Sequence, residues 1–289
     1  MALNKETFKT RSLTALVFVV VMLAGLLWNF WAFFILFSVV HFGCWFEYLQ
    51  LVEKINATKI DTLVKYFFAV CGFALLLVIG FQHISLDVFT TIGGYKISYK
   101  LLTWLLMLAG LAMVARQNKQ IPAKAKWMCF AGLLYISLSL ALLTNLRDSI
   151  SFTDLGKIYV CGIIFSIWIN DTMAYLVGSL IGKTPFSKIS PKKTWEGTSG
   201  GAILCVVVIS LLGMIIPVAK VIEVKHWIAI AAICAIFGTI GDLFESKLKR
   251  VANVKDSGSF MPGHGGFLDR FDSLLIASPF VWLYIKLFV

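Results

Sequence analysis

Long apolar blocks with almost no charge dominate this sequence. We count nine of them, centred on residues 13–28, 30–49, 63–82, 99–115, 127–145, 156–181, 198–217, 227–246 and 272–289. Blocks of about 17 to 20 apolar residues match the thickness of a bilayer. Because backbone groups in lipid must bond within their own segment, each block is expected to form a helix. The sequence therefore predicts an all-α, polytopic integral membrane protein with about nine transmembrane helices in a single membrane domain, residues 1–289.

Composition agrees with this fold class. Hydrophobic residues make up 59% of the chain and charged residues 14%, compared with roughly 25% charged in average soluble domains. The six cysteines each fall inside an apolar block without a CxxC spacing, so we expect buried thiols instead of a disulfide or zinc site. A basic start precedes the first apolar run, but no small-residue cleavage site follows it. This run is therefore expected to be the first membrane helix.

The distribution of basic residues predicts the orientation. With the N-terminus in the cytoplasm, 19 of the 26 Lys and Arg residues fall in cytoplasmic segments, as the positive-inside rule requires. We therefore expect the N-terminus inside and the C-terminus outside, in a cell membrane of the bacterial inner-membrane type. The net charge of +11 follows largely from this topology and does not by itself indicate a nucleic-acid partner.

Acidic residues, which topology does not explain, concentrate near the end of the chain. Five of the 15 lie within 31 residues: Asp242, Glu245, Asp256, Asp269 and Asp272. Asp242 and Asp269 fall at facing ends of the last two predicted helices, and carboxylates so placed are ligands that Mg²⁺ takes. In isolation, helix capping or pairing with a lysine is an alternative explanation for each acid. Their coincidence on one face of the membrane favours a magnesium site beside the loop at 246–272.

Basic and small residues accompany these acids. Three basic residues of the same region can neutralise phosphate oxygens: Lys249, Arg250 and Lys255. The first of these shares a helix face with Asp242 and Ser246. Residues 262–266, Pro-Gly-His-Gly-Gly, allow a tight turn that approaches a ligand closely. His264 alone is more typical of a structural hydrogen bond than of a catalyst.

A second polar cluster lies on the same predicted side of the membrane. Asp171 and its polar neighbours interrupt the sixth apolar block, and an acid that deep in a span is a functional candidate. The loop at 187–197 is basic and rich in hydroxyl groups. Within it, Ser190, Lys192 and Lys193 suit a phosphate clamp as well as interfacial anchoring, and both interpretations stay open.

These residues resemble the signature of a known family. The segments 246–258 and 262–272 are similar to the signature of the phosphatidate cytidylyltransferases, or CDP-diacylglycerol synthases. The segments 170–175 and 190–197 look like that family's other polar blocks. The sequence departs from the family pattern at three positions, where a glycine, a basic residue and an isoleucine or leucine are usual: Met173, Ser179 and Met261. None of these departures changes an acid.

The resemblance implies a nucleotidyltransferase of phospholipid biosynthesis that moves the cytidylyl group from CTP to phosphatidic acid with Mg²⁺, releases pyrophosphate and faces the cytoplasm. The catalytic half would be 156–289, with 1–150 as a scaffold. Together with the residue pattern, the resemblance assigns catalytic roles to Asp242, Asp269, Asp272, Lys249, Arg250 and His264. It assigns phosphate binding to Lys192, Lys193, Ser190, Ser246, Lys255 and Arg270. It assigns metal binding to Asp242, Asp269 and Asp171.

Two other classes stay open on the sequence. A CTP-dependent enzyme similar to polyprenol kinases would carry comparable charges, but without the block at 264–272 in this form. A transporter of phosphorylated lipid would also place polar groups inside the membrane. Formation of a homo-oligomer is left open as well. In the second apolar block, His41 and Glu47 are interpreted as a buried polar pair in preference to residues that line a site.

Overall fold

The computed structural model describes residues 5–81, 89–92, 95–98, 121–148, 154–260 and 265–289, and most of 103–112. The long helices are α1 (Lys5–Leu27), α2 (Phe30–Asn56), α3 (Thr62–Gly80), α7 (Leu155–Ile181), α8 (Trp195–Ile215), α9 (Val224–Val251) and α10 (Leu268–Phe288). A continuous helical rod consists of α5 (Ala123–Gly132), the π-helical turn η1 (Leu133–Leu138) and α6 (Ser139–Asp148). The remaining elements are the 3₁₀ turn η2 (Pro217–Val221) and the strands β1 (Phe89–Ile92) and β2 (Tyr95–Ser98).

Among the described residues, seven stretches of helix are long and apolar enough to cross a bilayer: α2, α3, the α5–α6 rod, α7, α8, α9 and α10. Two shorter apolar helices, Ser12–Leu27 within α1 and Thr103–Ala112, coincide with the first and fourth predicted blocks. The all-α membrane fold is thus confirmed, whereas the count of nine spans stays a prediction. The apolar blocks did not predict the antiparallel hairpin β1–β2, whose strands are rich in β-branched and aromatic residues.

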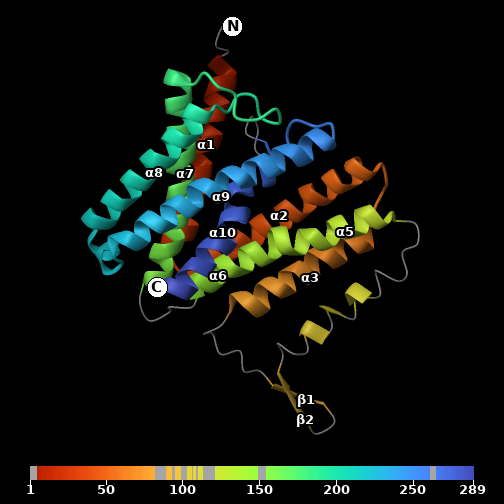
Figure 1. Cartoon of the computed structure of the whole chain (residues 1–289). Helices are drawn as coiled ribbons and strands as arrows, with labels where there is room; N and C mark the ends of the chain where they lie inside the picture. Colours follow the sequence, from red (N-terminus) through yellow and green to blue (C-terminus); the bar gives the residue numbers. More distant parts are fainter. Residues whose placement is uncertain are drawn as a thin grey trace.

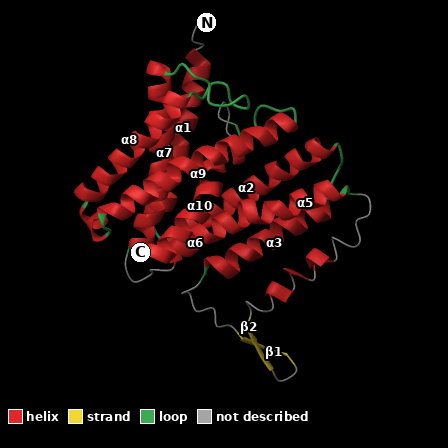
Figure 2. Ribbon diagram, viewed as in Figure 1, coloured by secondary structure: helices red, strands yellow, loops and turns green. Residues whose placement is uncertain are grey.

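The helices run between two ends of one bundle. Figure 1 shows that the segments following α7 and α9 lie at the same end as the beginning of α1, while the C-terminus lies at the opposite end. Figure 2 shows helices forming nearly all of the bundle, with the hairpin β1–β2 beyond its far end. The two segments predicted to carry the site thus share one end of the bundle. That this end faces the cytoplasm stays a prediction.

A buried core joins the N-terminal and C-terminal parts of the chain. Its fully buried side chains include Trp45 of α2 and Leu143 of α6 from the N-terminal part and Leu275 of α10 from the C-terminal part. All six cysteines are free thiols, and all but the partly exposed Cys161 are buried, so the prediction of unpaired thiols in apolar surroundings is confirmed.

Glycines set how closely the last helices pack. A Cβ atom on Gly201 of α8 would lie 2.6 Å from the backbone nitrogen of Ala174 of α7. A Cβ atom on Gly241 of α9 would lie 2.5 Å from the carbonyl oxygen of Asp272 of α10. Both distances are shorter than any side-chain carbon tolerates, so each approach requires glycine. These contacts bring the polar ends of α7, α8, α9 and α10 together.

Candidate active site

A polar cavity of about 450 Å³ lies where α7, α8, α9 and α10 meet. Its acidic lining comes from three helices: Asp171 of α7, Asp242 of α9, and Asp269 and Asp272 of α10. Lysine, hydroxyl and amide groups complete the polar lining: Lys192, Lys193, Thr194, Thr198, Ser179, Tyr175, Thr239, Ser273 and Asn170. The two polar clusters that the sequence indicated separately therefore share this cavity.

Three carboxylates in and beside the polar cavity lie within reach of a single metal ion. One oxygen from each of Asp242, Glu245 and Asp272 lies within 4.8 Å of the other two. Glu245 and Asp272 are buried, and Asp242 is partly exposed. Gly241 makes this arrangement possible, because α9 can then lie directly against the backbone of Asp272. Sequence reasoning gave Glu245 no role, although its position three residues after Asp242 places both on one helix face.

Lys249 lies between two acids and is not part of the described cavity lining. Its Nζ lies 2.5 Å from Oε2 of Glu245 and 2.6 Å from Oδ1 of Asp269. The lysine side chain is 13% exposed, and the acidic side chains are 0% and 8% exposed, respectively. If one member of this buried group of Lys249, Glu245 and Asp269 is removed, a buried charge is left without compensation. Lys249 therefore neutralises protein carboxylates, and its contact with substrate phosphate stays a prediction.

Asp269 is held by donors on both of its oxygens. Lys249 contacts Oδ1. Oδ2 accepts hydrogen bonds from the backbone N–H groups of Ser257 and Gly266, at 3.0 and 2.7 Å, and lies 2.9 Å from the hydroxyl oxygen of Ser257. Gly265 has φ +86°, and a Cβ atom there would lie 2.5 Å from Oδ2 of Asp269. The chain thus turns tightly around this carboxylate, whose role as a metal ligand stays a prediction.

The segment between α7 and α8 brings Lys192 and Lys193 to the cavity. Lys193 forms an ion pair with Asp242, so the two predicted clusters are in direct contact. The start of this segment is held against the first turn of α8. Glu196 in that turn accepts hydrogen bonds from the backbone N–H and the hydroxyl of Thr184, at 3.1 and 2.8 Å. The N–H of Phe186 also donates to the carbonyl oxygen of Lys193 at 2.7 Å, so the two sides of the segment are held together next to the lysines.

Some predicted site residues lie away from the cavity wall. Its described lining lacks Ser190, Ser246, Arg250, Lys255 and Arg270. Ser246 still touches the site, because its hydroxyl donates to Oδ1 of Asp242 at 3.4 Å. Ser190 shapes the lysine segment by accepting a hydrogen bond from the N–H of Lys193 at 3.1 Å. His264 lies outside the described residues. The phosphate-binding and catalytic roles assigned to these residues, and the metal role of Asp171, stay predictions.

The structure corrects the interpretation of His41 and Glu47 as a buried polar pair. Nε2 of His41 lies 3.0 Å from the hydroxyl oxygen of Ser137. Glu47 instead accepts hydrogen bonds from the N–H groups of Phe267 and Leu268, each at 2.9 Å. The reason is helical geometry, since residues six apart do not share a face. Glu47 therefore contacts the beginning of α10, the helix that carries two of the acids.

The charge balance of the site fits a bound cation. Five acids gather here: Asp171, Asp242, Glu245, Asp269 and Asp272. Lys193 and Lys249 form ion pairs with these acids, Lys192 lines the cavity, and Arg270 lies close enough to Asp171 to attract its charge. Among the described residues the acids thus exceed the basic groups by one. Apart from its ion pair, Glu245 has no hydrogen-bond partner among the described residues. Buried carboxylates need compensation, and a group of carboxylate oxygens suits Mg²⁺. The residues present thus fit a divalent ion at Asp242, Glu245 and Asp272.

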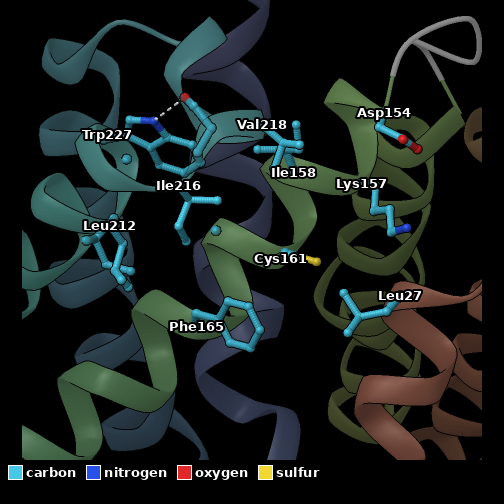
Figure 3. A pocket seen from close by; sticks show the side chains of 14 residues that line it. Leu27, Asp154, Lys157, Ile158, Cys161, Phe165, Leu212, Ile216, Val218 and Trp227 are labelled. Atoms are coloured by element: carbon cyan, nitrogen blue, oxygen red, sulfur yellow. Dashed lines mark hydrogen bonds between the residues drawn. The ribbon is translucent and has the colours of Figure 1, made fainter.

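A second cavity, of about 300 Å³, lies between α7, α8 and the beginning of α9 (Figure 3). It is lined mainly by apolar side chains such as Phe165 and Trp227, with Asp154 and Lys157 at the start of α7. The indole N–H of Trp227 is already bonded to the carbonyl of Ala219, at 3.2 Å. A lining of this kind offers a charged ligand few partners, so the polar cavity is the better candidate for chemistry.

The fold and the polar cavity define a helical membrane protein that gathers carboxylates and lysines at one end of its bundle. Comparison with known proteins gives this class a family. The family model described as "Cytidylyltransferase family" matches residues 9–288, which is nearly the whole chain. The chain belongs to the cytidylyltransferase family.

Curated relatives share substantial identity over part of their length. A phosphatidate cytidylyltransferase of Bacillus subtilis is 36% identical over 158 residues, 54% of this chain and 56% of the relative. A phosphatidate cytidylyltransferase of Thermotoga maritima is 38% identical over 140 residues, 47% of this chain and 52% of the relative. The phosphatidate cytidylyltransferase 5, chloroplastic, of Arabidopsis thaliana is 42% identical over 130 residues, 44% of this chain and 30% of the relative. The chain thus spans about half the length of the bacterial relatives it matches.

Proposed function

We propose that this chain is a phosphatidate cytidylyltransferase, which transfers the cytidylyl group of CTP to phosphatidate and forms CDP-diacylglycerol and pyrophosphate. The observation that carries the proposal is the polar cavity, where acids from three helices meet Lys192 and Lys193 at one end of a membrane bundle. A cavity in that position can receive a nucleotide from water and a phosphate headgroup from the bilayer. The similarity to phosphatidate cytidylyltransferases of two bacteria supports the same reaction.

Magnesium is part of the proposal. Asp242 and Asp272 would hold the ion together with Glu245, because oxygens of these three side chains lie within 4.8 Å of one another. Asp269 and Asp171 would supply further negative charge at the cavity wall. When bound, such an ion neutralises charge on the nucleotide phosphates and on the leaving pyrophosphate.

The protein's own residues would bind and orient the two substrates. Lys192 and Lys193 lie on the cavity wall and can form charge-assisted contacts with phosphate oxygens. The attacking group is the phosphate of the lipid, a monoester that is already largely ionised near neutral pH, so the reaction requires no strong base. Alignment of this phosphate with the α-phosphorus of CTP would provide much of the rate acceleration.

The substrates also suggest how the protein sits in its membrane. CTP is available in the cytoplasm, so the end of the bundle that carries the polar cavity would face that compartment. This orientation agrees with the distribution of basic residues along the chain. CTP and phosphatidate are the partners that the reaction needs, and no nucleic acid takes part.

A product assay tests the proposed reaction. Purified protein in nanodiscs, given CTP, phosphatidate and Mg²⁺, should release pyrophosphate and form CDP-diacylglycerol, and chelation of the metal should stop turnover. Asp242→Asn keeps the size of the side chain but removes charge, so turnover should fall by about 100-fold or more. Lys59→Ala changes an exposed lysine near the start of α3 and should have no effect.

Other outcomes would contradict the proposal. Release of CDP with a polyprenol acceptor would identify a CTP-dependent kinase. Movement of phosphorylated lipid between leaflets without release of either product would identify a transporter. Full turnover of Asp242→Asn with an unchanged Mg²⁺ requirement would exclude this acid as a metal ligand.

A further inference from the structure

We propose that Glu47, on a helix of the N-terminal part of the chain, is a positioning residue that sets the location of Asp269 at the polar cavity. The proposal rests on the proposed function only in that Asp269 acts in the cavity it lines. Glu47 is not part of the described lining. Its effect would therefore pass through the chain segment that surrounds Asp269.

Glu47 is a buried carboxylate, and its three hydrogen-bond donors among the described residues all come from that distant segment. Its side chain lies on α2, and the residue is 4% exposed. Oε1 accepts from the N–H of Phe267 at 2.9 Å, and Oε2 accepts from the N–H of Leu268 at 2.9 Å and from the hydroxyl of Ser257 at 2.7 Å. These donors are more than 200 residues away in the chain. Glu47 thus fastens the start of α10 and the end of the preceding loop to α2.

Ser257 connects Glu47 directly to Asp269. Its hydroxyl oxygen lies 2.7 Å from Oε2 of Glu47 and 2.9 Å from Oδ2 of Asp269. Its backbone N–H also donates to Oδ2 of Asp269, at 3.0 Å. The hydroxyl has a single proton, which goes to the nearer acceptor, Glu47, while the backbone N–H goes to Asp269. A displacement of either acid must therefore move Ser257 or break a hydrogen bond.

Two glycines show how tightly the segment fits around Glu47. A Cβ atom on Gly258 or on Gly266 would lie 2.2 Å from a carboxylate oxygen of Glu47. The second of these glycines also donates its N–H to Asp269, at 2.7 Å. The carboxylate of Glu47 therefore occupies the space that side chains at these two positions would need, and the backbone of both glycines lies directly against it.

The chemistry of the contact makes the charge of Glu47 important. All three hydrogen bonds use an oxygen as acceptor, and the two backbone donors lie at the positively polarised beginning of α10. Glutamine has the same length, but its amide offers one acceptor oxygen and an NH₂ group that would face N–H donors. Glu47→Gln should therefore loosen the segment without creating a cavity.

Glu53 provides a matched control on the same helix. Its Oε1 accepts a hydrogen bond from the N–H of Ile60 at 2.7 Å, and its Oε2 lies 2.7 Å from Nζ of Lys65. Glu53 thus holds a neighbouring turn as Glu47 holds the segment around Asp269, and its hydrogen bond and ion pair both go to that turn and the start of α3. Glu53→Gln measures what the loss of such an anchor does to the fold in general.

The experiment compares Glu47→Gln and Glu53→Gln in the purified full-length chain. Hydrogen exchange should increase in peptides covering 257–268 for Glu47→Gln alone. In the product assay with CTP, phosphatidate and Mg²⁺, kcat of Glu47→Gln should fall by about 100-fold, the scale expected when a reacting group is misplaced by about 1 Å. The Mg²⁺ concentration at half-maximal rate should rise, while KM for phosphatidate changes little.

A double variant separates positioning from general stability. If Glu47 acts through Ser257, then Glu47→Gln combined with Ser257→Ala should lower kcat no further than the more damaging single change. Fully multiplicative losses in the double variant would overturn this route to Asp269. Increased exchange at 257–268 with unchanged kcat would overturn the positioning role, and so would unchanged exchange in Glu47→Gln.

Failure of the proposed function gives a different result. In that case the unaltered chain makes no CDP-diacylglycerol, whatever happens at position 47. The exchange measurement then still decides whether Glu47 holds the segment around Asp269, because it requires no turnover. Faster hydrogen exchange at 257–268 in Glu47→Gln but not in Glu53→Gln would support the role of Glu47 in positioning Asp269. Equal exchange at 257–268 in the two variants would overturn this role.

Discussion

Replacement of Lys249 by alanine tests whether buried ion pairs hold the site together. Lys249 forms ion pairs with Glu245 and with Asp269. The side chain of Glu245 is fully buried. Removing one member of a buried ion pair costs about 3–5 kcal/mol, because charge is left without compensation. Folded proteins have a total stability of about 5–15 kcal/mol. The unfolding temperature of Lys249→Ala should therefore fall by about 10 °C.

Lys65→Ala is the matched control for this prediction. Nζ of Lys65 lies 2.7 Å from Oε2 of Glu53, but the two side chains are 30% and 20% exposed. Pairs in contact with water contribute about 0–1 kcal/mol, so Lys65→Ala should change the unfolding temperature little. A thiol-reactive dye can follow unfolding of both variants, since the buried cysteines become reactive when the chain unfolds.

A second substitution tests the cause of the loss. Glu245→Gln removes one of the two charges that Lys249→Ala leaves unpaired, so the double variant should recover part of the lost stability. Activity should not recover, because Glu245 is also a proposed metal ligand and Asp269 has lost its lysine. Equal temperature shifts for Lys249→Ala and Lys65→Ala, or no recovery in the double variant, would refute the reasoning.

Two further predictions concern packing and orientation. Gly241→Ala places a Cβ atom 2.5 Å from the carbonyl oxygen of Asp272, so it should destabilise the protein by about 1–3 kcal/mol and lower turnover. In the control Gly238→Ala the nearest atom is 3.5 Å from the new Cβ, so this variant should be tolerated. Equal thermal stability of the two variants would contradict the close packing at Gly241. Ser259→Cys should resist a membrane-impermeant thiol reagent in intact cells, while Lys220→Cys should react. Both positions are exposed, but they lie on opposite predicted sides of the membrane. The reverse pattern would contradict the proposal that the polar cavity faces the cytoplasm.

The sequence by itself determined the membrane fold and the region of the site. The length of an apolar run relative to the bilayer is a local property, so the helices could be placed without knowing their neighbours. The polar segments around Asp171, Lys193, Asp242 and Asp272 could also be recognised locally. All four residues line one cavity in the structure. The number of spans does not follow from apolar length alone, because the apolar helices Ser12–Leu27 and Thr103–Ala112 are shorter than the seven candidate spans.

Only the tertiary structure decided which groups touch. Sequence spacing put Lys249 on the same helix face as Asp242, but the structure pairs it with Glu245 and Asp269. It also places the carboxylate of Glu47 against the start of α10, more than 200 residues further along the chain. Contacts of this kind depend on how closely two helices approach. That approach is set by glycines and buried surfaces on both partners, so no local pattern in either helix specifies it.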